Sequence, residues 1–564
     1  MVEIYCENIK KSIQCEPGTT LSQLLMKIEI TGKWPFLAAI VDNQLKELSF
    51  PVYMPHQVRF IDYTDRDGQR CYSRSLIFVL QRAIAKLYPQ YSLIVDYNMQ
   101  NGMYCELREL EQEEGESPKI VSLSEDEIDK IRVSMQELID ADLPFSREKV
   151  HTEEAVKLFR NNHREEKAVL HESRGKFFTT VYYLDGYADH FYGPLTERTG
   201  VLKTFVFESF SRGFLLNIPT ITSPYEIKKS PYQYKLFDVF KEHSEWCSIL
   251  GVRGVGNLNN TILDNKSRDM IQIAEGLHER KYAAIADQIY QRRGDVKLVL
   301  IAGPSSSGKT TTSKRVALQC KVLGLNPIII EMDNYFVDRE KTPRDEHGHY
   351  DFESFHALDV EFLALQMNQL FNGETIVLPK FNFAEGRRII NGDTLKMGEK
   401  DILIMEGIHA LNPALTKGIA PDKYFRIYAS ALTSLSLDEN NNISTSDNRL
   451  IRRIVRDGNY RGVSPEETIL RWPSVRRGEI RNIFPYQENA DVMFNSALIY
   501  ELPVLKYYAE PLLRRIHPNS PASTESIRLL KFLSYIQEMQ PSEISLIPPT
   551  SVIREFIGGS SFKY

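Results

Sequence analysis

A glycine-rich loop lies between a strand-like and a helix-like segment near the middle of the chain. Val296–Ala302 is a short apolar run, Gly303–Thr310 reads G-P-S-S-S-G-K-T, and Thr311–Leu323 has the composition of a helix. A buried strand that enters a helix through such a loop is the arrangement that binds the phosphates of a nucleotide. The alternative, a Ser- and Gly-rich turn with a solvated lysine, is disfavoured by the flanking segments. The sequence therefore predicts a nucleoside triphosphate site.

The residue types of this loop suit the contacts that phosphate binding requires. Gly303 and Gly308 allow the tight turn that directs backbone N–H groups and the positive end of the helix at the ligand. Lys309 is expected to reach the β- and γ-phosphates, and the Thr310 hydroxyl is expected to ligate Mg²⁺. The predicted ATP-binding residues are Gly303, Pro304, Ser305, Ser306, Ser307, Gly308, Lys309, Thr310 and Thr311.

Length and composition indicate how many domains the chain has and which classes of protein it does not resemble. A chain of 564 residues predicts three or four domains. Its net charge of −6 argues against a globally basic nucleic-acid binder. Its six cysteines include no C-x-x-C pair, which indicates free thiols in a reducing compartment. No apolar run approaches roughly 18 residues, and no secretory leader is recognisable, so we expect a cytoplasmic protein without a membrane partner.

Strand and helix patterns alternate from the glycine-rich loop onward, which is typical of a mainly parallel sheet covered on both faces. Ligands of such sheets bind beyond the carboxyl ends of the strands. Asp333 and Glu406 each follow a predicted strand. Asp333 can accept the proton of an attacking hydroxyl, and Glu406 can hold Mg²⁺; a cap at Asp333 and a structural carboxylate at Glu406 stay open as alternatives. The predicted strands are 296–302, 327–332, 401–405, 424–429 and 491–494.

An arginine-rich segment follows the fourth predicted strand. Arg449, Arg452, Arg453 and Arg456 would share one face of a helix, and Arg461 follows them. Guanidinium groups neutralise charge on a transferred phosphoryl group, which favours a lid over the triphosphate. A solvated amphipathic helix is the alternative, because leucine, isoleucine and valine form its other side. The preceding residues 436–448, rich in Asn, Ser and Asp, are predicted to form a flexible hinge loop.

Residues 296–497 resemble the uridine kinase and phosphoribulokinase family. The resemblance includes the glycine-rich loop, the pattern Arg452-Arg453, Arg456-Asp457 and Arg461-Gly462, and the segments Met332–Phe336, Tyr350–Glu353, Ala357–Asp359, Leu378–Phe383 and Glu406–Ile408. It implies a P-loop kinase that uses ATP and Mg²⁺ and phosphorylates a small molecule.

The same resemblance implies roles for individual residues. Asp333 aligns with the catalytic base, and Lys309, Arg456 and Glu406 complete the predicted catalytic set. Glu353 or Asp359 aligns with contacts to ribose hydroxyls, and Arg452 and Arg461 align with phosphate and lid contacts. Tyr335, Phe381 and Phe383 are the predicted aromatic contacts of the acceptor.

The acceptor itself stays open, because the chain departs from the uridine kinase pattern. Uridine kinases have a histidine that touches the pyrimidine three residues after Pro-x-Tyr-Asp-Phe, whereas this chain has Phe381-Asn382-Phe383 and then Gly386. A site built for a polar contact loses discrimination when the contact is missing. A nucleoside or a sugar alcohol therefore remains the predicted acceptor.

The first 62 residues show the pattern of turn, strand and helix signals that is typical of a small β-grasp module, with Pro17-Gly18 as a turn and a helix beginning near Thr20. They resemble the TGS domain of threonyl-tRNA synthetases in Pro17–Leu21 and Ala39–Asn43. Residues 63–261 resemble the second additional, editing domain of the same synthetases in His151–Ala155 and Asp189–Leu195.

The editing family holds a metal at four positions, which correspond here to Cys71, Ser75, Phe191 and Leu195. Phe191 and Leu195 cannot donate to zinc, so we expect no inherited hydrolytic metal site. Aromatic residues such as Tyr182 and Tyr183 could stack on RNA bases, although packing in the core is the simpler interpretation.

Three functional hypotheses follow. The first is an ATP-dependent small-molecule kinase in residues 295–500, and the second is a nucleotide-switched module that contacts RNA or tRNA through its N-terminal half. An aminoacyl-ester hydrolase is the third. A helical connector at 262–294 and a C-terminal helical extension and tail at 501–564 complete the predicted multidomain α/β and α+β chain, whose oligomeric state the sequence leaves open.

Overall fold

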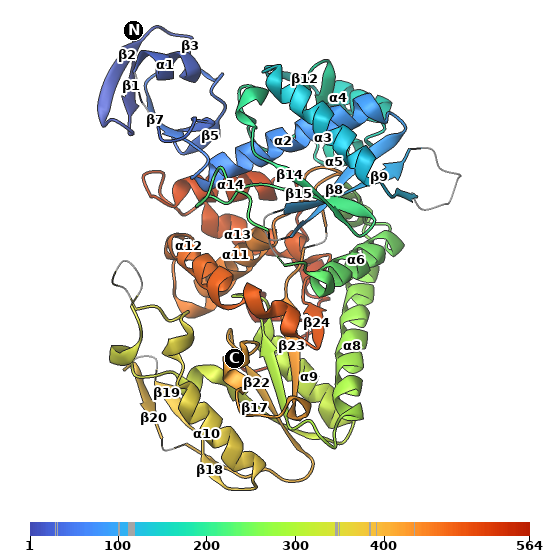
Figure 1. The fold of residues 1–564 in the computed structure, drawn as a ribbon, viewed down its shortest axis with the longest axis vertical. Helices are drawn as coiled ribbons and strands as arrows, with labels where there is room; N and C mark the ends of the chain where they lie inside the picture. The colour runs from blue at the N-terminus through green and yellow to red at the C-terminus, as the bar shows by residue number, and fades with distance from the viewer. Residues whose placement is uncertain are drawn as a thin grey trace.

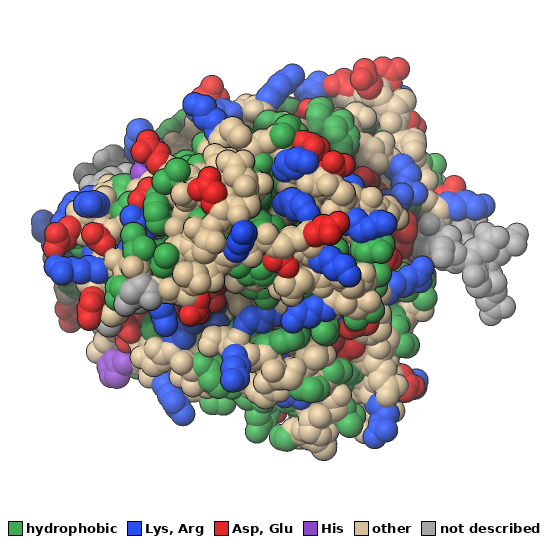
Figure 2. Space-filling view, turned by 90° about the horizontal axis from the view of Figure 1, so that it is seen from below, with side chains coloured by type: hydrophobic (Ala, Val, Ile, Leu, Met, Phe, Trp, Pro, Cys, Tyr) green, Lys and Arg blue, Asp and Glu red, His purple; other side chains and the backbone are tan. Residues whose placement is uncertain are grey.

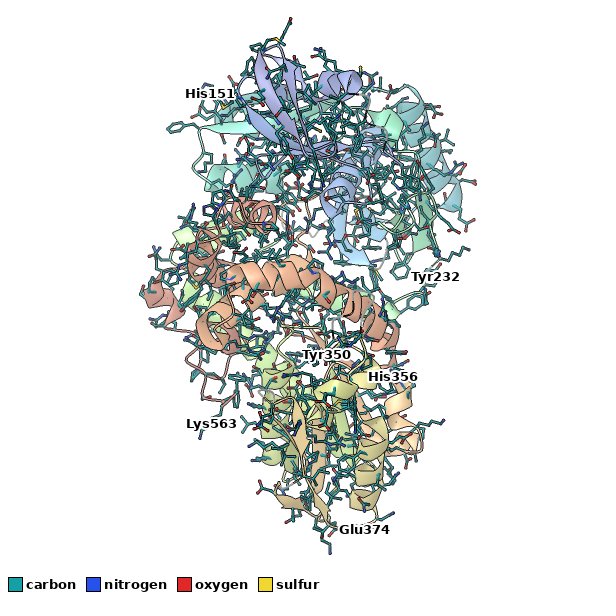
Figure 3. The ribbon with its side chains drawn as sticks, turned by 90° about the vertical axis from the view of Figure 1, so that its left-hand side faces the viewer. His151, Tyr232, Tyr350, His356, Glu374 and Lys563 are labelled. Carbon is teal, nitrogen blue, oxygen red and sulfur yellow. The ribbon has the colours of Figure 1, made fainter. Side chains whose placement is uncertain are left out.

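The computed structural model contains the whole chain and describes all residues except 29, 31, 100–101, 111–118, 230, 345–347, 349, 383–384, 391 and 434. Figure 1 shows three levels: two N-terminal units at the top, a layer of helices in the middle, and an α/β domain at the bottom. In the side view of Figure 3, His151 and Tyr232 lie in the upper level, whereas Tyr350, His356 and Glu374 lie in the α/β domain.

The first unit is a mixed five-stranded sheet crossed by one helix. Its strand order is β2-β1-β7-β4-β5, in which β1 and β7 are parallel. Helix α1 (Leu21–Lys27) begins at Thr20, whose side chain accepts a hydrogen bond from the Gln23 backbone in a capping box. The predicted turn at Pro17-Gly18 and the predicted helix are present, whereas kinship with TGS domains stays a prediction. The strands are β1 (Val2–Cys6), β2 (Lys11–Cys15), β4 (Ala38–Val41), β5 (Gln44–Lys46) and β7 (His56–Ile61).

The second unit combines two antiparallel sheets with flanking helices. In the larger sheet β9 (Gly102–Glu109) pairs with its neighbours on both edges, and the smaller sheet has the order β11-β12-β13. The other strands are β8 (Tyr91–Met99), β10 (Ile120–Val121), β11 (Ser146–His151), β12 (Phe178–Leu184), β13 (Tyr187–Asp189), β14 (Val206–Phe210) and β15 (Gly213–Asn217). The helices are α2 (Arg66–Leu87), α3 (Glu125–Asp140), α4 (Thr152–Asn161), α5 (Glu165–Ser173) and α6 (Tyr234–Ile249).

The four positions compared with editing-domain metal ligands come from one helix and one turn that touch. Ser75 accepts a hydrogen bond from the Thr196 backbone N–H at 2.8 Å, which joins α2 to the turn. Phe191 and Leu195 are buried in an apolar core, and Cys71 is fully buried. Burial raises the pKa of the Cys71 thiol to about 12, which keeps it protonated and poorly nucleophilic.

The α/β domain is a fully parallel sheet with the order β17-β22-β16-β23-β24. Every residue of the central strand β16 is buried, as the apolar run predicted. Helices α9 (Lys309–Val322) and α10 (Val360–Phe371) cover the sheet. The five predicted strands are confirmed within about two residues. They are β16 (Leu298–Ala302), β17 (Asn326–Glu331), β22 (Asp401–Glu406), β23 (Tyr424–Ser430) and β24 (Val492–Asn495).

The middle layer is a hydrophobic core that residues from distant parts of the chain build together. Leu170 and Leu258 of the N-terminal half pack in the same cluster as Ile454, Leu505 and Phe556. The long helix α8 (Ser267–Gln291) runs beside this layer down to α9 (Figure 1). The other helices of the layer are α7 (Val255–Leu263), α11 (Thr445–Arg456), α12 (Pro465–Asn482), α13 (Glu501–Leu513) and α14 (Ser523–Leu533).

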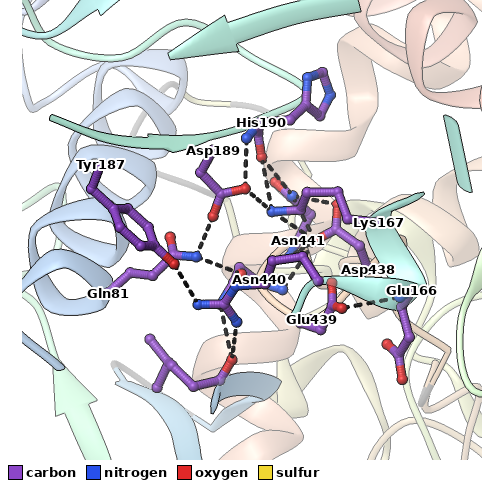
Figure 4. A network of polar contacts seen from close by, with 12 residues as sticks. Gln81, Glu166, Lys167, Tyr187, Asp189, His190, Asp438, Glu439, Asn440 and Asn441 are labelled. Carbon is purple, nitrogen blue, oxygen red and sulfur yellow. Dashed lines mark hydrogen bonds and ion pairs between the residues drawn. The ribbon is translucent and has the colours of Figure 1, made fainter. Parts of the chain in front are cut away.

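The prediction of a flexible hinge at residues 436–448 is wrong, because the loop is buried in the N-terminal half. Asp438 and Asn441 are at most 3% exposed. Figure 4 shows the contacts: Lys167 pairs with Asp189 and lies 3.7 Å from Asp438, and Asn441 donates to the His190 carbonyl at 3.2 Å. The polar composition suggested a solvated turn, whereas here the polar groups satisfy partners from a distant segment.

The same loop contributes a backbone contact to the larger sheet. The Val95 N–H donates to the Glu439 carbonyl at 2.8 Å, and the Glu439 carboxylate accepts from the Glu166 backbone N–H at 3.0 Å. Burial, with Glu166 and Asp438 nearby, raises the pKa of Glu439 to about 8. The α/β domain and the N-terminal half are therefore joined by a polar plug, residues 438–441.

Among the described residues, none of the helices combines the length and the apolar character needed to cross a bilayer.

The buried Lys167 predicts a large loss of stability on truncation. Lys167→Met should lower the free energy of unfolding by about 3 to 5 kcal/mol, because it leaves Asp189 and Asp438 buried without their cation. Urea unfolding followed by fluorescence measures the change. Lys157→Met, at an exposed lysine of α4, is the matched control and should shift stability by less than about 0.5 kcal/mol. Equal stability of the two variants would contradict a structural role for the plug.

Candidate active site

The glycine-rich loop, residues 303–308, joins the end of β16 to the first turn of α9. Gly303 lies against the neighbouring strand, since a Cβ there would collide with the Ala429 carbonyl of β23. Gly308 has φ of 79°, in the left-handed region that favours glycine. Both glycines are therefore required by geometry, as the motif predicted.

The loop carries polar groups that its own fold does not satisfy. The hydroxyls of Ser306 and Ser307 are buried and have no hydrogen-bond partner among the described residues. Lys309 donates only to the Pro304 carbonyl, at 3.2 Å, and no described carboxylate lies within ion-pair distance of it. Unpartnered donors at a helix N-terminus fit an oxygen-rich anion such as a triphosphate.

Thr310 and Glu406 meet at the end of the central strands. The Thr310 hydroxyl donates to Glu406 Oε1 at 2.7 Å. Parallel register places Glu406 beside Ile301 of β16 and Glu331 of β17. Burial raises the pKa of Glu406, and Lys309 opposes the shift. A hydroxyl and a carboxylate are oxygen ligands that suit Mg²⁺, which takes its remaining ligands from water and phosphate.

Asp333 follows β17 in a short 3₁₀ turn, Met332–Tyr335. Its side chain is exposed to solvent, so a substrate can approach it. The protein that surrounds it raises the pKa of Asp333 by partial desolvation, and Lys309 opposes this shift. A raised pKa makes a carboxylate a better proton acceptor near neutral pH.

Glu353 and Asp359 have different surroundings. Glu353 packs against Gly478 of α12, where a Cβ would lie 2.6 Å from that of Glu353. Burial and then Glu479 raise the pKa of Glu353 to about 7, while Arg453 and Lys309 oppose the shift. Asp359 caps α10 through the Phe362 N–H at 3.1 Å and pairs with Arg388 at 2.8 Å. Glu353 is therefore, like Asp333 and Glu406, a carboxylate with charge coupling to the loop lysine.

The predicted aromatic contacts are only partly in place. Tyr335 is fully buried, and its hydroxyl donates to Gln366 at 2.8 Å, so it does not line a site in this structure. Its burial corrects the predicted contact, because the 3₁₀ turn directs Tyr335 into the core. Phe336 is half-buried and packs edge-on against Phe381 with ring centroids 5.8 Å apart. Phe383 lies outside the described residues.

Five arginines beside the loop pair with two carboxylates. Glu479 pairs with two arginines, and Asp457 pairs with three. Burial lowers the pKa of three of them, Arg453, Arg461 and Arg476, and a neighbouring arginine adds to each shift. On the face seen in Figure 2, basic and acidic side chains are interspersed. The five arginines are Arg449, Arg453, Arg456, Arg461 and Arg476.

The arginine helix is neither solvated nor wholly free to act as a lid. Arg449 donates to the Ser305 carbonyl at 3.0 Å, and Arg452 donates to the Ser306 carbonyl at 3.4 Å. Arg452 is fully buried and also pairs with Glu501, so it supports the loop from the side of the protein interior. Arg461, in contrast, keeps 60% of its side chain exposed. A phosphate contact by Arg452 stays a prediction, and Arg461 has the more open position.

Two residues that hold the loop carried no signal in the sequence. Glu479 accepts from the Ser305 N–H at 3.1 Å while it pairs with Arg449. Burial alone would raise the pKa of Glu479. The positive charges of Arg449 and Arg476 outweigh this effect, so the pKa of Glu479 lies below its usual value. The Ser496 hydroxyl donates to the Ser307 carbonyl at 2.5 Å. Both lie outside recognisable motifs, so only the tertiary fold identifies them.

Known proteins resemble the part of the chain that contains this site. Residues 298–500 match the Phosphoribulokinase / Uridine kinase family. A uridine kinase of Shewanella frigidimarina is 30% identical over 200 residues, which cover 35% of this chain and 85% of the relative. A uridine kinase of Ligilactobacillus salivarius is 27% identical over 198 residues, covering 35% of this chain and 83% of the relative. A segment that spans most of the relative at this identity shows common descent. Through its α/β domain the chain belongs to the phosphoribulokinase and uridine kinase family.

Proposed function

We propose that this protein transfers the γ-phosphoryl group of ATP to a hydroxyl of a nucleoside or a related small molecule. The observation that supports this proposal is that the exposed Asp333 and Lys309, which pairs with no described carboxylate, lie at the same edge of the parallel sheet and are electrostatically coupled. A base and a phosphate-binding cation at that edge are the two groups that phosphoryl transfer requires.

The residues divide the work of the transfer. Asp333 accepts the proton of the acceptor hydroxyl as its oxygen bonds to the γ-phosphorus and the bond to the bridging oxygen breaks, releasing ADP. Lys309 and the arginines paired with Asp457 offset the negative charge of the transferred group. Mg²⁺, when bound at Thr310 and Glu406, neutralises charge on the β- and γ-phosphates.

A nucleoside is the acceptor class that the relatives support. Both relatives are named uridine kinase, and Glu353 supplies a carboxylate suited to paired ribose hydroxyls. Because the base-contact motif of uridine kinases is replaced, experiment must decide which base the nucleoside carries and whether a sugar alcohol is the acceptor instead. A panel of both classes, assayed for ADP release, identifies the acceptor.

A second candidate is a nucleotide-switched module with little acceptor kinase activity. The buried plug of residues 438–441 favours it, because the chain runs from β23 at the phosphate site directly into the N-terminal half. ATP hydrolysis that no acceptor stimulates, together with nucleotide-dependent hydrogen exchange at residues 438–441, would favour this candidate.

Replacing the proposed base should separate binding from transfer. Asp333→Asn should lower kcat by at least about 100-fold, because the amide cannot take the hydroxyl proton, while ATP affinity stays within about twofold. ADP release with the best acceptor measures kcat, and Lys309→Ala provides the blank. Glu340→Gln, at an exposed carboxylate of the following loop, is the control and should keep full activity. Undiminished turnover by Asp333→Asn would refute the assignment.

The raised pKa of Glu353 predicts a pH dependence. If the carboxylate form binds acceptor hydroxyls, kcat/KM should rise as pH increases through about 7, where Glu353 loses its proton. Glu353→Gln should lower kcat/KM at pH 8 by about tenfold and remove this rise. Glu361→Gln, at an exposed carboxylate on α10, should keep it. An unchanged profile in Glu353→Gln would exclude the contact.

A further inference from the structure

The C-terminal tail, residues 548–564, lies on the nucleotide-binding helix. Lys563, labelled in Figure 3, lies at the outer edge of the molecule beside the α/β domain. Arg315 of α9 donates to the Thr550 carbonyl at 2.7 Å, and Lys314 donates to the Lys563 carbonyl. The first turns of α9 are thus contacted at both ends of the tail.

The tail places a carboxylate on the first turn of α9. Glu555, on the short helix α16 (Arg554–Ile557), accepts from the Thr311 backbone N–H at 3.3 Å and from the Thr311 hydroxyl at 2.6 Å. The hydroxyl of Tyr564 lies 2.9 Å from the same Thr311 hydroxyl. Thr311 is completely buried. Both donors of Thr311 are therefore occupied by the tail.

The donors that Glu555 occupies are of the kind that a phosphate oxygen requires. Thr311 follows Lys309 and Thr310 in the first turn of α9, where free N–H groups and the helix dipole bind anions. A carboxylate oxygen on an N–H and a hydroxyl stands in for a phosphate oxygen with the same two donors. Its negative charge also repels a nucleotide that approaches the loop.

The tail is fixed on both sides of the site. Val552 covers the loop, since a Cβ on Gly308 would lie 2.5 Å from its Cγ2. The Tyr460 hydroxyl, from the segment after α11, donates to the Ile557 carbonyl at 2.6 Å. The Arg452 guanidinium lies 4.9 Å from the centre of the Phe556 ring. These contacts position Glu555 and tie the tail to the helix that braces the loop.

We propose that the tail is an internal competitor for nucleotide, and that Glu555 must leave Thr311 before the phosphates of ATP bind. The inference rests on the proposed function only for the identity of the ligand. The apparent dissociation constant is then the intrinsic constant divided by the fraction of molecules whose tail has withdrawn. Loss of the Glu555 contact should raise that fraction and tighten nucleotide binding.

Binding of a fluorescent ATP analogue with Mg²⁺ to the full-length protein tests the proposal. Glu555→Ala should bind at least about tenfold more tightly than the wild type, the range expected for one charge-assisted hydrogen bond. Glu555→Gln should be intermediate, because its amide oxygen still accepts from Thr311 without the charge. Glu538→Ala is the control, since that carboxylate makes no hydrogen bond to the described residues of the loop or of α9, and its affinity should equal the wild-type value.

Hydrogen exchange supplies an independent readout. Adding the nucleotide to the wild type should increase exchange at residues 550–564, the part of the tail that follows its two prolines, because binding displaces the tail. Affinity of Glu555→Ala equal to or weaker than that of the wild type would overturn the proposal, as would increased protection of the tail on binding. Lys309→Ala added to Glu555→Ala should abolish binding, which ties the gain to the loop.

The outcomes separate this proposal from the proposed function. Tighter binding by Glu555→Ala without phosphorylation of any acceptor would sustain the competitor and refute the kinase assignment. Acceptor phosphorylation with an affinity indifferent to Glu555 would sustain the kinase and refute the competitor. Absence of nucleotide binding in both the wild type and Glu555→Ala would refute both.

Discussion

The parallel pairing of β16 with β22 and β23 is the constraint on which the site depends. Because all strands of a parallel sheet end at the same edge, Lys309, Glu406 and Asp333 gather there although about 100 residues of sequence separate them. Together with the loop, the two carboxylates form the edge at which we propose that the acceptor and the triphosphate meet. The helices of the middle layer hold this edge from the other side, through Arg449 and Glu479, so the loop is braced before any ligand arrives. Such preorganisation lowers the cost of binding a highly charged ligand.

The parts of the structure that local patterns determine could be predicted from the sequence. A short apolar run followed by a glycine-rich turn has few alternatives, so the sheet and the loop follow from composition and order. Burial of individual residues could not be predicted in the same way. Tyr335 and Asp333 belong to one short turn, and only the packing of α10 decides that the tyrosine enters the core. The polar residues 438–441 look like a solvated loop because their partners, Lys167 and Asp189, are far away in the sequence. Glu479 and Glu555 likewise act through tertiary contacts that no motif records.

The middle layer makes the N-terminal half and the kinase domain parts of one body. Its core includes residues that precede the kinase domain, belong to it and follow it, so the C-terminal extension is a structural component of the whole. The extension ends on the nucleotide helix, and one of its aromatic residues, Tyr535, lies within hydrogen-bond distance of His190 in the N-terminal half. The extension therefore contacts both the N-terminal half and the α/β domain within one packed body.

The plug at residues 438–441 also has a consequence for the order of synthesis. Lys167 and Asp189 leave the ribosome about 250 residues before the loop that completes their surroundings. At typical elongation rates this delay lasts roughly 10 to 50 seconds, during which the polar groups of the N-terminal half that contact residues 438–441 have no partner from that loop. Until the kinase domain has been translated, Lys167 and Asp189 therefore lack the loop that completes their surroundings, and a chain that ends before residue 438 never acquires it.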